Sequence, residues 1–370
     1  MKKSEYSLRQ ILVLTLTGFL APAADLLPGL LARRSGRGGW LVPLVMLPAV
    51  VLWALLLGRL FREEESGLFT LIRRRLGAVF GGALTLLYIM WGIGLLAEQL
   101  NRSAARMGVV YGGRGGEAVA AAVLLLAVWV TCGGRGTLFR AGELFWLVAA
   151  VGTVCVLLLA LPRIRVEYLA PEPGWMAGGI DYLNVWGGTV LGTALLARVP
   201  RKTGTTRAAV GWVMAAGLCA FGLTAVVLGQ TGAGLAARLE HPFLTVVQGI
   251  TLEGALARLE GPVAALWLVA DFCRMGLLLA VLREAGGERW GRWLVRLGSL
   301  LAGGAQFYPL EGEVGVPWGL LLGFLVPACL CLGEILARKG GGDSTYCGGE
   351  VGKNHRYCNA QKRSKKAKKT

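Results

Sequence analysis

Ionisable residues inside apolar stretches are the first candidates for chemistry in this 370-residue chain. Asp271 and Arg274 are three positions apart in one such stretch, where they would share a helical face and neutralise each other. We therefore favour a structural pair, with ion coupling at Asp271 as the alternative. Asp25 follows Pro22 in another stretch, where it would bind a ligand ammonium or a cation, or lie in a water-filled mouth.

Catalytic and metal-binding patterns are missing from the sequence. Of the two histidines, His241 precedes a proline and His355 lies in a polar tail, and neither has an evident partner. Six of the eight cysteines are scattered through apolar stretches and two lie in the tail, without a CxxC spacing. We expect a protein that is not an enzyme and that has no metal and no cofactor.

Two interruptions by glycine and proline mark the candidate ligand site. Glycines, small residues and prolines weaken a helix and free backbone groups, and transporters bind ligands where two interrupted helices meet. The candidate ligand-binding residues are Gly18, Ala21, Pro22, Ala23 and Asp25 in the first interruption and Trp186, Gly187, Gly188 and Thr189 in the second. Close helix packing through Gly188 and Gly192 is the competing explanation.

These interruptions belong to apolar stretches long enough to cross a membrane. The chain is 55% hydrophobic and only 16% charged, which excludes an ordinary soluble domain. About 20 apolar residues cross a bilayer as a helix. We predict ten spans, at Leu8–Leu31, Trp40–Phe61, Leu76–Leu96, Ala118–Thr131, Leu144–Leu161, Ile180–Val199, Ala208–Leu228, Pro262–Leu282, Trp293–Leu310 and Val314–Ala337.

The ten spans divide into two sets of five of similar length, about 8–161 and 180–337. Because five is odd, the second set would start on the opposite side of the membrane, as in the inverted repeats of secondary transporters. The predicted fold is thus an all-α integral membrane protein with ten transmembrane helices, a five-plus-five inverted repeat, and broken helices 1 and 6. It would occupy residues 1–338.

The net charge of +17 follows mostly from membrane topology. With the C-terminal tail left aside, 18 Lys and Arg fall in segments predicted to be cytoplasmic and 10 in segments predicted to be external. The positive-inside rule therefore places both termini in the cytoplasm and 229–261 outside, as an amphipathic helix or lid. Residues 339–370 form a basic tail that we expect to be disordered, either solvated or lying on anionic membrane lipid, and we expect no nucleic acid partner.

Three stretches in this order resemble the permease-like B subunit of bacterial spore germinant receptors, in the amino acid/polyamine/organocation superfamily. They are Tyr6-Ser7-Leu8-Arg9-Gln10 with Leu27-Pro28 and Trp40, Gly136 to Glu143 before the fifth span, and His241-Pro242 to Gln248 with Leu259-Glu260 and Trp267. The chain departs from that pattern at Ala21 and Pro22, where the family usually has glycine, and at Asp25.

The resemblance implies a receptor subunit in the inner membrane of a dormant spore. It would bind a small germinant, often an amino acid, and assemble with a larger A subunit and a lipoprotein C subunit. An ion-coupled amino acid transporter is the alternative function, because a receptor and a transporter of this fold would share the same pocket.

Overall fold

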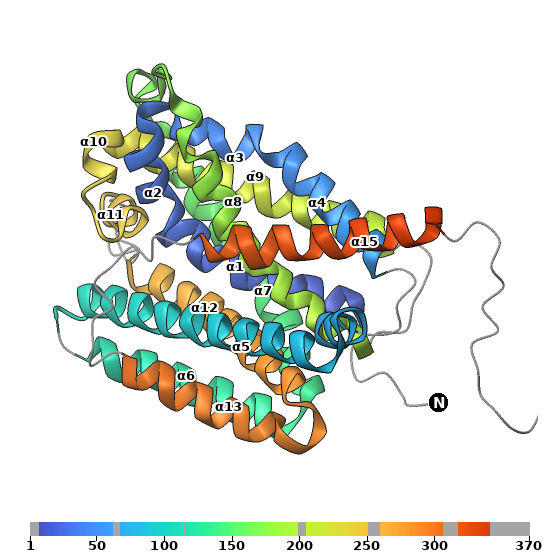
Figure 1. The fold of residues 1–370 in the computed structure, drawn as a ribbon. Coiled ribbons are helices and arrows are strands. Elements are labelled where there is room, and N and C mark those ends of the chain that lie inside the picture. Colours follow the sequence, from blue (N-terminus) through green and yellow to red (C-terminus); the bar gives the residue numbers. More distant parts are fainter. Residues whose placement is uncertain are drawn as a thin grey trace, which may run out of the picture. The chain divides into compact units, whose positions relative to one another are not determined.

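The computed structural model describes residues 7–61, 67–113, 115–198, 205–250, 260–305 and 317–340, and every regular element in these ranges is helical (Figure 1). The chain divides into two compact units, Met1–Cys331 and Leu332–Thr370. The described part of the second unit is the C-terminal end of one helix. Beyond residue 340 the predicted basic tail lies outside the described residues.

The helices follow one another with short connections. The α-helices are α1 (Leu8–Asp25), α2 (Leu27–Ser35), α3 (Val42–Val45), α4 (Leu47–Leu60), α5 (Leu68–Val110), α6 (Gly116–Gly133), α7 (Arg135–Ala160), α8 (Gly179–Gly187), α9 (Thr205–Thr231), α10 (Ala233–Ala236), α11 (Pro242–Gln248), α12 (Glu260–Ala285), α13 (Gly287–Gly304), α14 (Trp318–Leu320) and α15 (Val326–Gly340). The other helical turns are η1 (Gly36–Leu41), η2 (Leu161–Arg163), η3 (Val166–Leu169), η4 (Trp175–Gly178), η5 (Gly188–Arg198) and the π-helix η8 (Leu321–Leu325).

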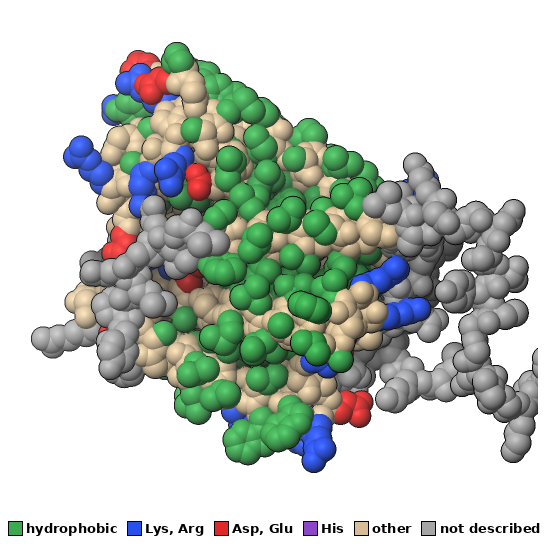
Figure 2. Space-filling view, viewed as in Figure 1, with side chains coloured by type: hydrophobic (Ala, Val, Ile, Leu, Met, Phe, Trp, Pro, Cys, Tyr) green, Lys and Arg blue, Asp and Glu red, His purple; other side chains and the backbone are tan. Residues whose placement is uncertain are grey.

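Six helical stretches in the described residues are long and apolar enough to cross a membrane. They are Leu27–Leu60, Leu68–Val110, Gly116–Gly133, Gly136–Arg163, Thr206–Thr231 and Glu260–Ala285. Large apolar side chains such as Phe80, Trp129 and Leu158 are exposed on them, and Figure 2 shows hydrophobic side chains over the middle of one face with charged ones towards its margins. An apolar belt of this kind faces lipid in a membrane protein.

The first, sixth, ninth and tenth predicted spans coincide with shorter or interrupted helices, and the end of the first also belongs to the stretch Leu27–Leu60. The first span is divided into α1 and α2, and the sixth into α8 and η5. The ninth begins in α13 and the tenth contains α14, η8 and α15, but 306–316, between them, lie outside the described residues.

Helix α5 is twice as long as the third predicted span. It continues to Val110 and bends at Gly77, whose φ of 77° and ψ of −178° are accessible to glycine because it has no Cβ. The third predicted span ends at Leu96, before Glu98, Arg102 and Arg106. In the structure they continue the helix and bring Arg106 into the protein interior, where 2% of this residue is exposed.

Helix α12 is the central helix of the bundle and packs against α1, α5, α6, α7 and α13. Every residue from Ala270 to Leu282 is buried. A helix that is apolar on all sides has no lipid-facing or water-facing stripe, so it is stable only when other helices surround it. Ionisable groups in α12 therefore lie in the protein interior rather than in lipid.

Two of the sequence stretches that suggested the resemblance meet in the structure. Ser7 and Gln10 form a capping box that satisfies backbone N–H groups at the start of α1. The Gln10 Nε2 atom then donates to Glu143 Oε2 in α7 at 2.9 Å. The Ser-x-x-Gln pattern thus starts a helix and also fastens it to α7.

Small residues allow α8 to touch α14 and η8 through their backbones. A methyl group at Gly187 would overlap the carbonyl oxygen of Gly319, and one at Gly323 would overlap Gly187. This observation supports close packing as the role of Gly187.

We expect Gly187→Ala to lower the free energy of unfolding by about 1–3 kcal/mol, the usual cost of inserting a methyl group into a packed interior. The measurement is the apparent melting temperature of the detergent-purified protein. Gly94→Ala is the matched control, because nothing lies within 4 Å of a methyl group at that exposed position in α5. Equal melting temperatures for the two variants would contradict the packing role.

Candidate functional site

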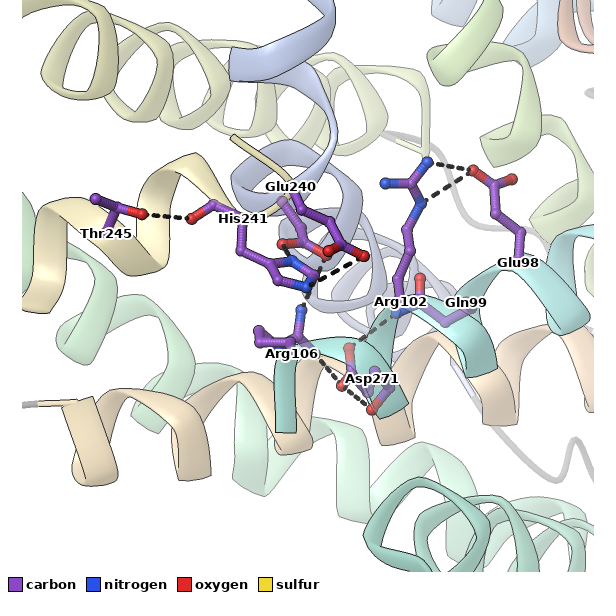
Figure 3. Close-up of polar contacts among 10 residues, drawn as sticks. Glu98, Gln99, Arg102, Arg106, Glu240, His241, Thr245 and Asp271 are labelled. Carbon is purple, nitrogen blue, oxygen red and sulfur yellow. Dashed lines mark hydrogen bonds and ion pairs between the residues drawn. The ribbon is translucent and has the colours of Figure 1, made fainter. Parts of the chain in front are cut away.

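Four ionisable side chains from four separate segments form one buried cluster, which we call the charge cluster (Figure 3). Its members are Asp25 at the end of α1, Arg106 in α5, His241 directly before α11, and Asp271 in α12. Their exposed fractions are 7%, 2%, 6% and 0%. Groups buried so deeply are shielded from bulk water, so they depend on partners inside the protein.

Asp271 is the most fully bound member of the charge cluster. Its carboxylate accepts hydrogen bonds from Gln99 Nε2 at 2.8 Å and Ser103 Oγ at 2.7 Å, and it is paired with Arg106 Nη2. The three donors recur at intervals of four and three residues, which places them on one face of α5. Helix α5 thus holds the carboxylate of α12 by a charge and two neutral donors.

Asp25 joins this pair to the segment between α9 and α12. Its Oδ1 lies 2.7 Å from His241 Nδ1, and its Oδ2 lies 3.4 Å from Arg106 Nη1. An ionised carboxylate only accepts hydrogen bonds, so with Asp25 ionised the donor of this contact is His241 Nδ1–H. His241, for which the sequence offered no evident partner, therefore binds Asp25, and Asp25 lies in the protein rather than in a water-filled mouth.

The charge cluster leaves hydrogen-bonding capacity unused. Among the described residues, Asp25 Oδ2, Arg106 Nε and Nη1, and His241 Nε2 have no hydrogen-bond partner. A small pocket adjoins them, lined by Ala24, Asp25, Arg106, Phe243, Leu244 and Trp267. Buried polar atoms without partners are uncommon in native structures, and an ion, a proton or water at this place would satisfy them.

The prediction that Arg274 neutralises Asp271 is wrong. The two residues share one helix, but Asp271 contacts α5, whereas the Arg274 side chain is aimed at the start of η5. Glu98 and Arg102 are the charged groups that act on Arg274. Three positions turn a helix by about 300°, so neighbours on one broad face can still contact different helices.

Arg274 instead brings the two predicted interruptions together. A methyl group at Gly18 would lie 3.1 Å from its Cα, and one at Gly188 would lie 3.5 Å from its Nη2. Only 8% of Arg274 is exposed, and within the described ranges its guanidinium makes no hydrogen bond or ion pair. A buried positive group without a bound partner thus faces the junction of α1 and η5.

The second interruption lies where the sequence placed it. Helix α8 ends at Gly187, and a 3₁₀-helix begins at Gly188. Trp186 is buried against Phe19, with ring centroids 4.3 Å apart, and the Thr189 hydroxyl donates to the Trp186 carbonyl oxygen.

The first interruption is displaced from its predicted place. Residues 18 to 25, including Ala21, Pro22 and Ala23, are buried and helical, and the break consists of Leu26 alone. Pro22 lacks a backbone N–H, yet α1 continues through it and packs against α7, α9 and α12. Asp25 lies two turns, about 10 Å, along α1 from Gly18, so the structure divides the predicted site into two parts.

Sequence reasoning missed Arg106, Gln99 and Ser103, although their spacing was a usable signal. A helix that continued the third span to Val110 would have placed all three on one face towards the interior. The pairing of His241 with Asp25 joins residues 216 positions apart, and no local pattern indicates it. Over the described ranges, no group of three or more His, Cys, Asp and Glu could hold a metal ion.

We expect Arg106→Gln to lower stability by about 3–5 kcal/mol, because it leaves Asp271 buried without its counter-ion. Adding Asp271→Asn should recover part of that loss. Arg102→Gln is the matched control one turn earlier on α5: its partner Glu98 is half exposed, so the loss should stay below about 1 kcal/mol. Melting curves of the purified variants give the comparison, and an Arg106→Gln protein as stable as Arg102→Gln would refute the assignment.

Comparisons with known proteins agree with the helical membrane fold. The structure is similar to that of a Na⁺-coupled sialic acid symporter solved in a substrate-bound, outward-open state, with a TM-score of 0.62. The similarity covers 89% of this chain and 78% of the symporter chain at 10% sequence identity, so it shows a shared fold alone. The comparison with curated protein sequences gives no match.

A comparison with models of protein families assigns the sequence to one family. The model of the spore germination protein family, the spore permeases, matches residues 6–283. This range holds the capping box of α1, the Gln10–Glu143 contact and the whole charge cluster. The chain is therefore a multi-pass membrane protein of the permease type that belongs to the spore germination protein family.

Proposed function

We propose that the protein is the membrane subunit of a spore germinant receptor, which binds a small germinant, an amino acid, and triggers germination. The family match over residues 6–283 carries this proposal. By the same resemblance, its partners are a larger A subunit and a lipoprotein C subunit in the inner membrane of the spore. An exposed apolar belt that includes Trp129 and Leu158 is available to lipid and to such partners.

We further propose ten transmembrane helices in two inverted sets of five. Support comes from the helices found at the described parts of all ten predicted spans, and from the symporter-like fold. In this scheme α1 with α2 opens the first set and α8 with η5 opens the second. Both are divided elements, as the transporter architecture requires at its ligand site.

The germinant site in this proposal lies between α1 and the junction of α8 with η5. Gly18, Gly188 and Arg274 lie together there, and within the described part of the chain the Arg274 guanidinium has no hydrogen-bond or ion-pair partner. A guanidinium can bind a carboxylate through two parallel hydrogen bonds. We therefore assign the germinant carboxylate to Arg274, and the apolar wall to Trp186 and Phe19.

The ion-coupled amino acid transporter remains the second candidate, because a protein of similar fold is a Na⁺-coupled symporter. Two assays separate the functions: uptake of labelled amino acids into proteoliposomes, and germination of spores that lack the protein. The receptor proposal expects loss of germination and no gradient-driven uptake. Normal germination of the deletion strain together with strong uptake would overturn it.

We expect Arg274→Gln to raise the germinant concentration required for half-maximal response by about tenfold or more, the value of one charged hydrogen bond. Gly188→Val should act in the same direction, because its extra methyl groups would reach the space beside Arg274 Nη2. Arg296→Gln is the control for loss of a positive charge, since that residue is exposed on α13. Normal protein abundance with an unchanged concentration dependence in both site variants would refute the location.

A further inference from the structure

Helix α13 packs against α5, α6 and α12 through one face. The buried residues of α13, Gly291, Val295, Gly298 and Ala302, recur at intervals of three or four positions, which places them on one side of the helix. A methyl group at Gly291 would overlap the Arg283 carbonyl oxygen. This close contact fixes the rotation of α13 about its axis, so its opposite face points away from these helices.

The outward face of α13 carries two rows of side chains in its first two turns. Trp290 and Trp293 are 60% and 64% exposed, and Arg289 and Arg292 are exposed beside them. The members of each pair are three positions apart, so the two pairs form neighbouring rows on the same face. Figure 2 shows protruding hydrophobic side chains with basic ones next to them at the lower edge, where Figure 1 places α13.

Neither arginine has a counter-ion within the described ranges. Their guanidinium groups make no ion pair or hydrogen bond with the residues described, and the Arg289 guanidinium carbon lies 5.9 Å from the ring centroid of Trp290. Glu288 precedes them, but two arginines leave a net positive charge on these first two turns. The surface therefore suits an anionic partner.

The place of this surface along α13 corresponds to the edge of the membrane. The predicted ninth span begins at Trp293, about one turn after Arg289, and the side chains of Leu297 and Leu300 beyond it are apolar and exposed. Tryptophan is enriched where the hydrocarbon meets the head groups, and arginine side chains extend from this level towards the phosphates. Arg296 lies within the predicted span and does not belong to this surface.

We propose that Arg289 and Arg292 bind the phosphate of an anionic phospholipid, with Trp290 and Trp293 at the level of its glycerol backbone. A guanidinium can pair with a phosphate through two parallel hydrogen bonds. A zwitterionic head group carries its own positive charge beside the phosphate, so the two arginines favour a lipid whose head group has a net negative charge. This site is separate from the charge cluster and from the Arg274 site, and it does not depend on the identity of the germinant.

Photo-crosslinking of the full-length protein in nanodiscs tests the proposal. The discs contain phosphatidylcholine and an increasing mole fraction of phosphatidylglycerol that carries a diazirine near its head group. Mass spectrometry measures labelling of the peptide that contains 287–296, so lipid bound elsewhere on the chain does not enter the measurement. Labelling should saturate at a low mole fraction of this probe. With the diazirine on phosphatidylcholine it should only rise in proportion, because probe and bulk lipid then compete equally.

The double variant Arg289→Gln, Arg292→Gln should raise the mole fraction required for half-maximal labelling by about 25-fold, or about fivefold for each arginine. Because both side chains are exposed, its melting temperature should equal that of the wild type. Arg37→Gln is the matched control. It removes an equal charge from an exposed arginine whose counter-ion belongs to the protein, since Arg37 Nε lies 3.2 Å from Glu172 Oε1, and it should leave the labelling curve unchanged.

Three results would overturn the proposal. Labelling of the wild type in simple proportion to phosphatidylglycerol would show that the surface does not select anionic lipid, which leaves it to a protein partner. A double variant with the wild-type curve would show that the two arginines do not bind the head group. Displacement of the probe by inorganic phosphate at constant ionic strength would assign the site to the free anion instead of the lipid.

Discussion

The ion pair between Arg106 and Asp271 is the interaction on which the arrangement of the described helices depends. Asp271 belongs to a helix that is buried on every side, and a carboxylate in such a place is tolerated only beside a positive charge and hydrogen-bond donors. Helix α5 supplies the charge of Arg106 and the donors of Gln99 and Ser103 from one face. These contacts fix the rotation of α5 about its axis and its position along that axis relative to α12. The same guanidinium reaches Asp25 and so also fixes the end of α1.

Close backbone approach complements this polar contact. Gly18 allows α1 to touch α12 at Arg274, and Gly187 allows α8 to touch Gly319. In lipid, helices gain little from hydrophobic association, so packing of small residues and buried polar contacts hold the bundle together. The two interactions have different effects. The glycines set the distance between the helices, and the charge cluster sets their rotation and their position along the helix axes.

The two buried positive groups have different surroundings and therefore suit different roles. Arg106 is paired with two carboxylates of the protein itself and acts as a structural counter-ion. Arg274 is also buried, but its guanidinium Nη2 lies beside Gly188 at the start of η5 and, among the described residues, forms no ion pair. A permease that recognises an anionic group needs a positive group of the second kind, held in place without being neutralised.

The sequence by itself determined the helical membrane class, the family resemblance and the helix interruption at Gly187 and Gly188. Each of these follows from local composition and spacing, which act within one helix. The third predicted span ended at Leu96, whereas α5 continues to Val110 because the polar face of its last turns is satisfied by Asp271 of α12. Which carboxylate Arg106 and His241 would bind, and that Arg274 would not bind Asp271, was decided only by the tertiary structure. Ion pairs between helices depend on rotation and height, and these are set by packing between segments far apart in the chain.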